Sequence, residues 1–74
     1  MDLDIKTIRM MWAFVETSNP HTLLKLSDSE LIQNLLKQVE SITPLSGKNN
    51  QLLSQYVSLR TLLIRELAYA KISP

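Results

Sequence analysis

The sequence predicts a small all-α protein, and three observations support that fold class. The 74-residue chain has one glycine and three prolines, and it lacks the Asn-Gly and Asp-Gly pairs of tight hairpins. Apolar residues recur three and four positions apart, which is the spacing of one face of a helix. The pattern breaks at SNP (18–20) and at TPLSG (43–47). We therefore expect a single domain over residues 1–74, folded as a three-helix antiparallel bundle.

The first predicted helix covers about residues 3–17. Asp2 or Asp4 can cap its N-terminus or favour the positive end of the helix dipole. Pro20 ends the helix, because the residue before a proline avoids the helical region. Its apolar residues form two stripes, the first with Ile5, Ile8, Trp12 and Val15, and the second with Leu3, Met10 and Phe14, with Met11 between the stripes.

The two stripes of this helix have different expected roles. We expect Ile8 and Trp12 to fill the core, although Trp12 beside two methionines can also form a Met-rich groove or an aromatic anchor at an interface. Met10 and Phe14 belong to the other stripe. Because one stripe suffices for the core, we expect the other to meet something outside the monomer.

The second predicted helix covers about residues 28–42 and has the clearest start signal in the chain. SDSE at 27–30 is a capping box, in which Ser27 accepts from the backbone of Glu30 and Glu30 reaches back. A single narrow apolar stripe follows it, with Leu31, Ile32, Leu35, Leu36, Val39 and Ile42. Before this helix, PHTLLKL at 20–26 can form a short fourth helical turn capped by Asn19.

The third predicted helix opens at Ser46 and covers about residues 47–71. Two adjacent apolar lines run along it, one with Leu52, Tyr56, Leu59, Leu63, Leu67 and Ala70, the other with Leu53, Val57, Ile64 and Ala68. Together they span about 180° of the helix, more than the ~100° stripe that faces one neighbour. Arg60 lies within this arc, whereas Arg65 lies on the polar side and needs no special role.

Arg60 has two interpretations. Its aliphatic stem can pack on the apolar arc while the guanidinium reaches water. Alternatively, the cation is paired, since a buried charge is tolerated only with a partner. We favour pairing, with a carboxylate or several backbone carbonyls near a subunit or partner boundary. The acidic candidates are Asp4, Glu16, Asp28 and Glu40.

Composition argues against several classes of function. The net charge of +1 provides no long-range field for nucleic acid or an anionic membrane. The chain has no cysteine, and His21, expected in an exposed loop, is its only imidazole, so we expect no disulfide, no metal and no cofactor. The longest apolar run, MMWAFV at 10–15, is shorter than the roughly 20 residues of a membrane span. The N-terminus lacks the basic region of a signal peptide, so we expect a cytoplasmic protein.

No constellation of residues predicts catalysis. The single histidine has no nucleophile partnered with it, and the carboxylate pairs lie where helix N-termini explain them. There is no phosphate loop, zinc-protease motif or calcium loop. Three short helices can include a DNA-binding helix-turn-helix, but the basic residues are spread along the chain instead of clustered.

Small size favours self-association. Below about 70–80 residues a core rarely supplies more than about 3–5 kcal/mol of net stability, and disulfides are impossible here. We therefore expect a homodimer to complete the bundle. The candidate interface residues are Met10, Phe14, Tyr56, Arg60 and Ile64.

Three segments carry a resemblance to known families. In IRMMW, LSDSELIQNLL and SLRTLLIRELA the chain resembles the small uncharacterised helical proteins of cyanobacteria. In YVSLRTLLIRELAYAK its last helix is similar to the phycobilisome-degradation adaptor family, whose members are short helical hairpins that dimerise. The resemblance implies a non-enzymatic regulator and assigns no residue a role. We therefore expect a protein–protein interaction module, an adaptor or regulator, with a DNA-binding transcriptional regulator as the alternative.

Overall fold

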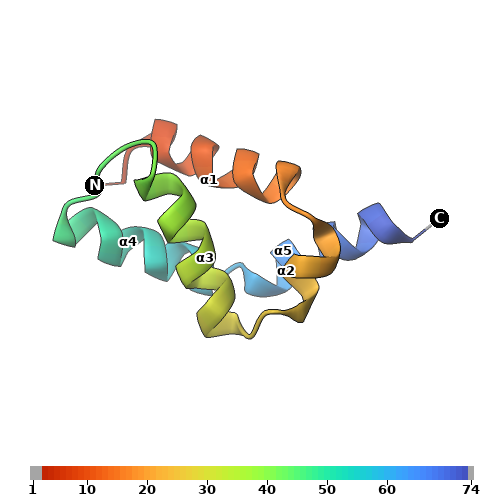
Figure 1. Cartoon of the computed structure of the whole chain (residues 1–74). Helices are drawn as coiled ribbons and strands as arrows, with labels where there is room; N and C mark the ends of the chain where they lie inside the picture. Colours follow the sequence, from red (N-terminus) through yellow and green to blue (C-terminus); the bar gives the residue numbers. More distant parts are fainter. Residues whose placement is uncertain (1–2, 74) are drawn as a thin grey trace.

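The computed structural model describes residues 3–73, which form five α-helices and, within that range, no strand (Figure 1). The helices are α1 (Ile5–Thr17), α2 (Pro20–Lys25), α3 (Asp28–Glu40), α4 (Gly47–Ser58) and α5 (Thr61–Ile72). The all-α class is therefore confirmed. The short connector helix forms, and the predicted third helix is divided into α4 and α5.

Local sequence signals account for where most of these helices begin. Ser27 and Glu30 form the predicted capping box, with N–H···O distances of 3.2 Å to the Ser27 hydroxyl and 3.0 Å to the Glu30 carboxylate. Asp4, Asn19 and Ser46 likewise each accept a backbone hydrogen bond at the N-terminus of α1, α2 and α4. Asp2, the alternative cap of α1, lies outside the described residues. Short polar side chains thus satisfy amide groups that the first helical turn leaves unpaired.

The central element of the arrangement is α3. It packs against α1, α4 and α5, while α2 packs against α5. Figure 1 shows α3 passing across the directions of α1 and α4 instead of running alongside them, so the antiparallel-bundle part of the prediction is not confirmed. The molecule measures 38 × 20 × 19 Å, and with so thin a body most helices keep one side exposed.

One hydrophobic core collects residues from all five helices. Four of its members come from α3 and belong to the single apolar stripe predicted there. The last member of that stripe, Ile42, lies beyond the end of α3 and is exposed, because the helix ends at Glu40 and not at residue 42. The core contains Met11, Val15, Leu23, Leu31, Leu35, Leu36, Val39, Leu53, Val57, Ile64 and Ala68.

The orientation of α1 differs from the expectation that one stripe is buried and the other exposed. Met11, which lies between the two stripes, is fully buried and points to the centre of the core. Trp12 on one flank and Met10 and Phe14 on the other are each partly buried against that core. Because Met11 faces the core, residues on both flanks of α1 pack against it within the monomer, and neither apolar stripe is left entirely without a partner.

The break between α4 and α5 occurs without glycine or proline. In a continuous helix the Tyr56 carbonyl would accept the Arg60 amide hydrogen. Here the Arg60 amide donates instead to Val57, at 2.9 Å, and its guanidinium Nη1 donates to the Tyr56 carbonyl, at 3.1 Å. Arg60 leaves the helical region, with φ −124° and ψ 14°. Its side chain thus takes the place of its own amide and satisfies the carbonyl that the break exposes.

Replacing Ser27 with alanine should lower the stability of the fold by about 0.5–2 kcal/mol without changing its helix content, because α3 loses its N-cap. Thermal unfolding followed by circular dichroism measures the change. Ser29→Ala, an exposed serine in the same turn, is the control and should leave the melting temperature unchanged or raise it slightly. Equal melting temperatures for Ser27→Ala and the wild type would contradict the capping role.

Candidate interaction surface

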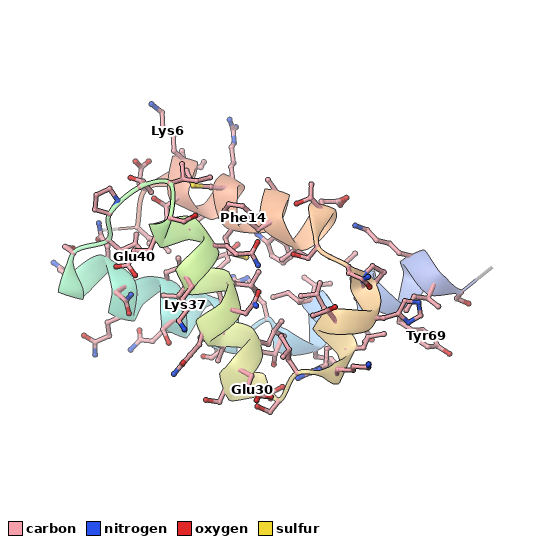
Figure 2. The ribbon with its side chains drawn as sticks, in the orientation of Figure 1. Lys6, Phe14, Glu30, Lys37, Glu40 and Tyr69 are labelled. Carbon is pink, nitrogen blue, oxygen red and sulfur yellow. The ribbon has the colours of Figure 1, made fainter. Side chains whose placement is uncertain are left out.

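Large apolar side chains are exposed along α5 and immediately before it. The exposed fractions are 82% for Leu59, 69% for Leu62, 45% for Leu63, 39% for Leu67 and 64% for Tyr69. We call these five residues the α5 face; Leu59 precedes the helix and the other four belong to it. Figure 2 shows Tyr69 projecting from α5 at the periphery of the molecule. An apolar surface of this kind is typical of a binding site.

The two apolar lines of the C-terminal segment have different environments, which accounts for the exposure of Leu59, Leu63 and Leu67. Leu62 and Tyr69 belong to neither line. The line with Leu53, Val57, Ile64 and Ala68 is the buried one, and every member belongs to the core. The other line starts half-buried on α4, at Leu52 and Tyr56, and becomes exposed once the chain enters α5. A helix turns 100° per residue, so Leu62 and Leu63 lie on opposite flanks of the outer side of α5, with Glu66 between them. Leu67 lies closer to the core side, which agrees with its lower exposure.

Trp12, Tyr56 and Arg60 form a cluster where α1 meets the end of α4. The Trp12 Nε1–H donates to the Tyr56 hydroxyl at 2.9 Å, and the two rings meet edge to face with centroids 6.4 Å apart. The Arg60 guanidinium carbon lies 3.8 Å from the centre of the Tyr56 ring, a cation–π geometry. All three residues are partly exposed, and these residue types are enriched among the strongest contributors to protein interfaces.

The environment of Arg60 shows how its cation is accommodated on the apolar side of this segment. Its partners are one backbone carbonyl and one aromatic ring, both from Tyr56 in the preceding turn. Among residues 3–73 no carboxylate forms an ion pair with it, so the expected acidic partner is not found there. The cation is thus accommodated locally, half-buried, and next to the start of the α5 face.

Arg65, which the sequence analysis assigned to the polar side without a role, holds α5 to the rest of the fold. Its Nη2 donates to the Leu26 carbonyl at 2.8 Å and to the Asp28 carboxylate at 2.7 Å, and its Nη1 donates to the Leu23 carbonyl at 3.4 Å. Two of these acceptors are backbone carbonyls at the end of α2, which only the tertiary fold brings near α5. No side-chain pattern could have indicated them.

A second long-range polar contact fixes the far end of α5. The Lys71 ammonium donates to the Glu16 backbone carbonyl and lies 3.6 Å from the Glu16 carboxylate. With Arg65 joined to the end of α2 and Lys71 to the end of α1, both contacts hold the helix in a defined orientation. The α5 face is therefore presented on a helix anchored at more than one point.

The five residues predicted for an interface do not form one surface. Ile64 is completely buried in the core, so its side chain is not available to a partner. Met10 and Phe14 pack partly against the core from α1, whereas Tyr56 and Arg60 belong to the aromatic cluster. The wide apolar arc indicated that some surface would remain uncovered, but it did not indicate which of its two lines.

An open groove of about 260 Å³ lies between α3 and α4. Figure 2 shows Lys37 and Glu40 on the part of α3 that borders it. The other lining residues are Ile32, Gln33, Leu36, Asn50 and Ser54. The groove is smaller than a usual ligand pocket of about 300–1,000 Å³, and its charged residues are exposed on the rim. It is therefore a weaker candidate than the α5 face.

Other kinds of site find no support in the part of the chain that the structure describes. There, no group of three or more His, Asp or Glu side chains comes together to hold a metal ion. None of the described helices has the length and apolar character to cross a membrane. His21 is exposed, in the first turn of α2 and not in a loop.

Comparison with protein-family models, with curated proteins and with solved structures found no match for this chain. The resemblance to cyanobacterial helical proteins and to the phycobilisome-degradation adaptors thus stays a prediction.

Substituting the two arginines separately should distinguish their roles. Arg65→Ala should lower the free energy of unfolding by about 2–3 kcal/mol, because two carbonyls lose a charged donor and the stem loses its packing. Arg60→Ala should cost only about 1 kcal/mol, from one hydrogen bond and one cation–π contact. Urea titration measures both values. As a control, Asp28→Asn should cost less than about 1 kcal/mol, because Asp28 is largely exposed. Equal costs for the two arginines would contradict this assignment.

The contact between Trp12 and Tyr56 should appear as a coupling energy of about 0.5–1.5 kcal/mol in a double-mutant cycle. Trp12→Phe and Tyr56→Phe each remove one partner of the hydrogen bond, and the double variant removes both. Urea unfolding of the four proteins provides the measurement. Trp12→Phe combined with Tyr69→Phe, an exposed tyrosine on α5, should be additive. A Trp12–Tyr56 coupling as small as in this control would contradict the contact.

Proposed function

We propose that the protein is a non-enzymatic protein–protein interaction module, an adaptor or regulator, that binds through the α5 face. One observation carries the proposal. Four leucines and a tyrosine are exposed on or immediately before a short helix whose inner side, with Ile64 and Ala68, belongs to the core. Scattered single apolar side chains are normal on a protein surface, whereas several large ones gathered on one short helix are typical of an interaction site.

The size of the exposed apolar surface supports a functional interface. The exposed fractions of Leu59, Leu62, Leu63 and Leu67 amount to about two whole leucine side chains. Burying that surface would contribute roughly 3–6 kcal/mol from this protein alone, at about 1.5–3 kcal/mol per leucine. A partner with a matching apolar surface would add a similar amount. Together these contributions are comparable with the ~4–15 kcal/mol that association costs in lost translational and rotational freedom.

The aromatic cluster adjoins this surface along the chain. Arg60 lies between Leu59 and the first residue of α5, and its guanidinium rests on the Tyr56 ring. The hydrogen bond from Trp12 holds that ring in turn. Large side chains that are already ordered lose little conformational freedom on binding, which favours association.

The charge of the α5 face favours a protein partner over nucleic acid. Glu66, the exposed charged residue among the leucines, is acidic. Lys71 and Arg65 are engaged with Glu16 and with the end of α2. Nucleic-acid interfaces instead need several cations directed at phosphates. The DNA-binding alternative therefore has no supporting observation on this surface.

Affinity capture from the native cell, with the tagged wild-type protein as bait, tests the proposal. Leu62→Glu places a charge on the α5 face and should reduce recovery of a stoichiometric partner by about tenfold or more, because the charge would be buried without a counter-ion. Ile42→Glu, at a similarly exposed apolar residue outside α5, should leave recovery unchanged. Equal recovery with both variants would argue against the α5 face. Salt-sensitive retardation of duplex DNA by the purified protein would support the alternative.

A further inference from the structure

We infer that the cluster of Trp12, Tyr56 and Arg60, together with Leu63 and Leu67, binds an acidic amphipathic segment of a partner protein. The inference rests on the proposed function and adds the chemistry of the partner. A carboxylate of the partner pairs with Arg60, and its apolar side chains cover the two leucines. Binding is thereby assigned to the flank of α5 that borders the cluster.

One flank of α5 continues into the cluster. Four residues follow one another at intervals of three or four positions, which places them along the same side of the helix: Arg60, Leu63, Leu67 and Lys71. Helix α1 meets this side near both ends, through Trp12 on Tyr56 and through Glu16 on Lys71. The two leucines therefore lie next to the cluster, whereas Leu62 and Tyr69 lie on the opposite flank.

Arg60 carries hydrogen-bond donors that the protein itself does not use. Its Nη1 donates to the Tyr56 carbonyl, but within residues 3–73 neither Nη2 nor Nε makes a hydrogen bond, and no carboxylate pairs with the cation. No buried side-chain nitrogen or oxygen of the described residues lacks a partner, so Nη2 and Nε reach the surface. They are accessible to a carboxylate from outside, which a guanidinium can bind through two parallel hydrogen bonds.

The Tyr56 hydroxyl provides a further donor beside the guanidinium. It accepts from Trp12 Nε1 at 2.9 Å, and its own hydrogen has no acceptor among the described residues. The Arg60 guanidinium lies over the same ring, 3.8 Å from its centre, so the two groups are neighbours. A carboxylate can accept from both, because its two oxygens accept several hydrogen bonds. The bond from Trp12 holds the ring before a partner arrives, which lowers the loss of side-chain freedom on binding.

The charges around this flank favour an acidic partner in one orientation. Arg60 has no acidic counter-ion within the described part of the chain, and Arg9, exposed on α1 one turn before Trp12, adds a second cation near the cluster. Glu66, at the outer centre of α5, would repel a carboxylate placed over the leucines. The acidic group of the partner is therefore directed to the Arg60 end, and its apolar groups to the leucines.

The spacing along the flank defines the form of the partner segment. At 1.5 Å per residue, Leu63 lies about 4.5 Å and Leu67 about 10 Å further along the helix axis than Arg60. A helical peptide matches these distances with residues three or four and seven positions apart, the usual anchors of helices bound to protein surfaces. We therefore expect an amphipathic helix with an acidic residue one and two turns from its apolar residues.

Selection from a displayed library of random peptides, with the purified full-length protein as target, tests the inference. The recovered peptides should combine an Asp or Glu with large apolar residues at helical spacing. Fluorescence anisotropy then measures the Kd of one recovered peptide, synthesised with a label. Arg60→Gln should weaken its binding about tenfold or more, because the peptide carboxylate loses a charged hydrogen bond. Lys37→Gln removes an exposed cation on α3 and should leave the Kd unchanged.

Two further comparisons locate the contact on the flank and on the carboxylate. Leu63→Ser should weaken peptide binding severalfold, because the peptide loses an apolar contact, whereas Tyr69→Ser, on the opposite flank, should leave it unchanged. Exchanging the acidic residue of the peptide for its amide should weaken binding to the wild type as much as Arg60→Gln does. The same exchange should have little further effect on Arg60→Gln, because the two changes remove one interaction. Circular dichroism verifies that each variant is folded.

The inference and the proposed function can fail separately. Recovery of no peptide, recovery of peptides without an acidic residue, or equal binding by Arg60→Gln and Lys37→Gln would each overturn the inference. A partner captured from the cell and lost in Leu62→Glu would still leave the interaction module standing. Peptide binding that depends on Arg60 and Leu63, with no partner captured from the cell, would support the site and count against the cellular role.

Discussion

The packing of α5 against α2 determines which side chains of α5 are exposed to a partner. Arg65 donates to the carbonyls of Leu23 and Leu26 and to the Asp28 carboxylate, and so sets how α5 is turned about its own axis. That rotation directs Ile64 and Ala68 into the core and the leucines outward. A helix with a broad apolar arc has no single preferred buried side. A polar contact with defined geometry can therefore decide between sides that hydrophobic burial leaves nearly equivalent.

The roles of the two arginines of the C-terminal segment are nearly the reverse of those that their positions on the helical wheel indicate. Arg60, on the apolar side, is accommodated by its own preceding turn, where it replaces a backbone hydrogen bond and stacks on Tyr56. Arg65, on the polar side, makes the long-range contacts. A planar guanidinium with several donors can serve either purpose, because it binds carbonyls in defined directions and also packs on an aromatic face. Which purpose applies depends on what lies opposite it in the fold.

Two aromatic residues lie at a junction between helices. Trp12 and Tyr56 come from helices far apart in the sequence, and their hydrogen bond joins α1 to α4 at the surface. Neither ring is fully buried, so each keeps apolar contact with the core and a polar group within reach of a partner. In a thin molecule these half-buried rings extend the core outward, next to the break at which α5 begins.

The sequence by itself determined the all-helical class, the capping box at Ser27 and Glu30, the caps at Asp4, Asn19 and Ser46, and the single buried stripe of α3. These features depend on residues within a few positions of one another, so local spacing is enough to indicate them. Only the tertiary structure decided the break at Arg60, the burial of Met11 between the two stripes of α1, and the exposure of one apolar line on α5. The last two depend on surfaces contributed by distant parts of the chain, whereas the contacts of Arg60 at the break are with the preceding turn. A broad apolar arc shows that a helix has more than one neighbour, but not on which side each neighbour lies.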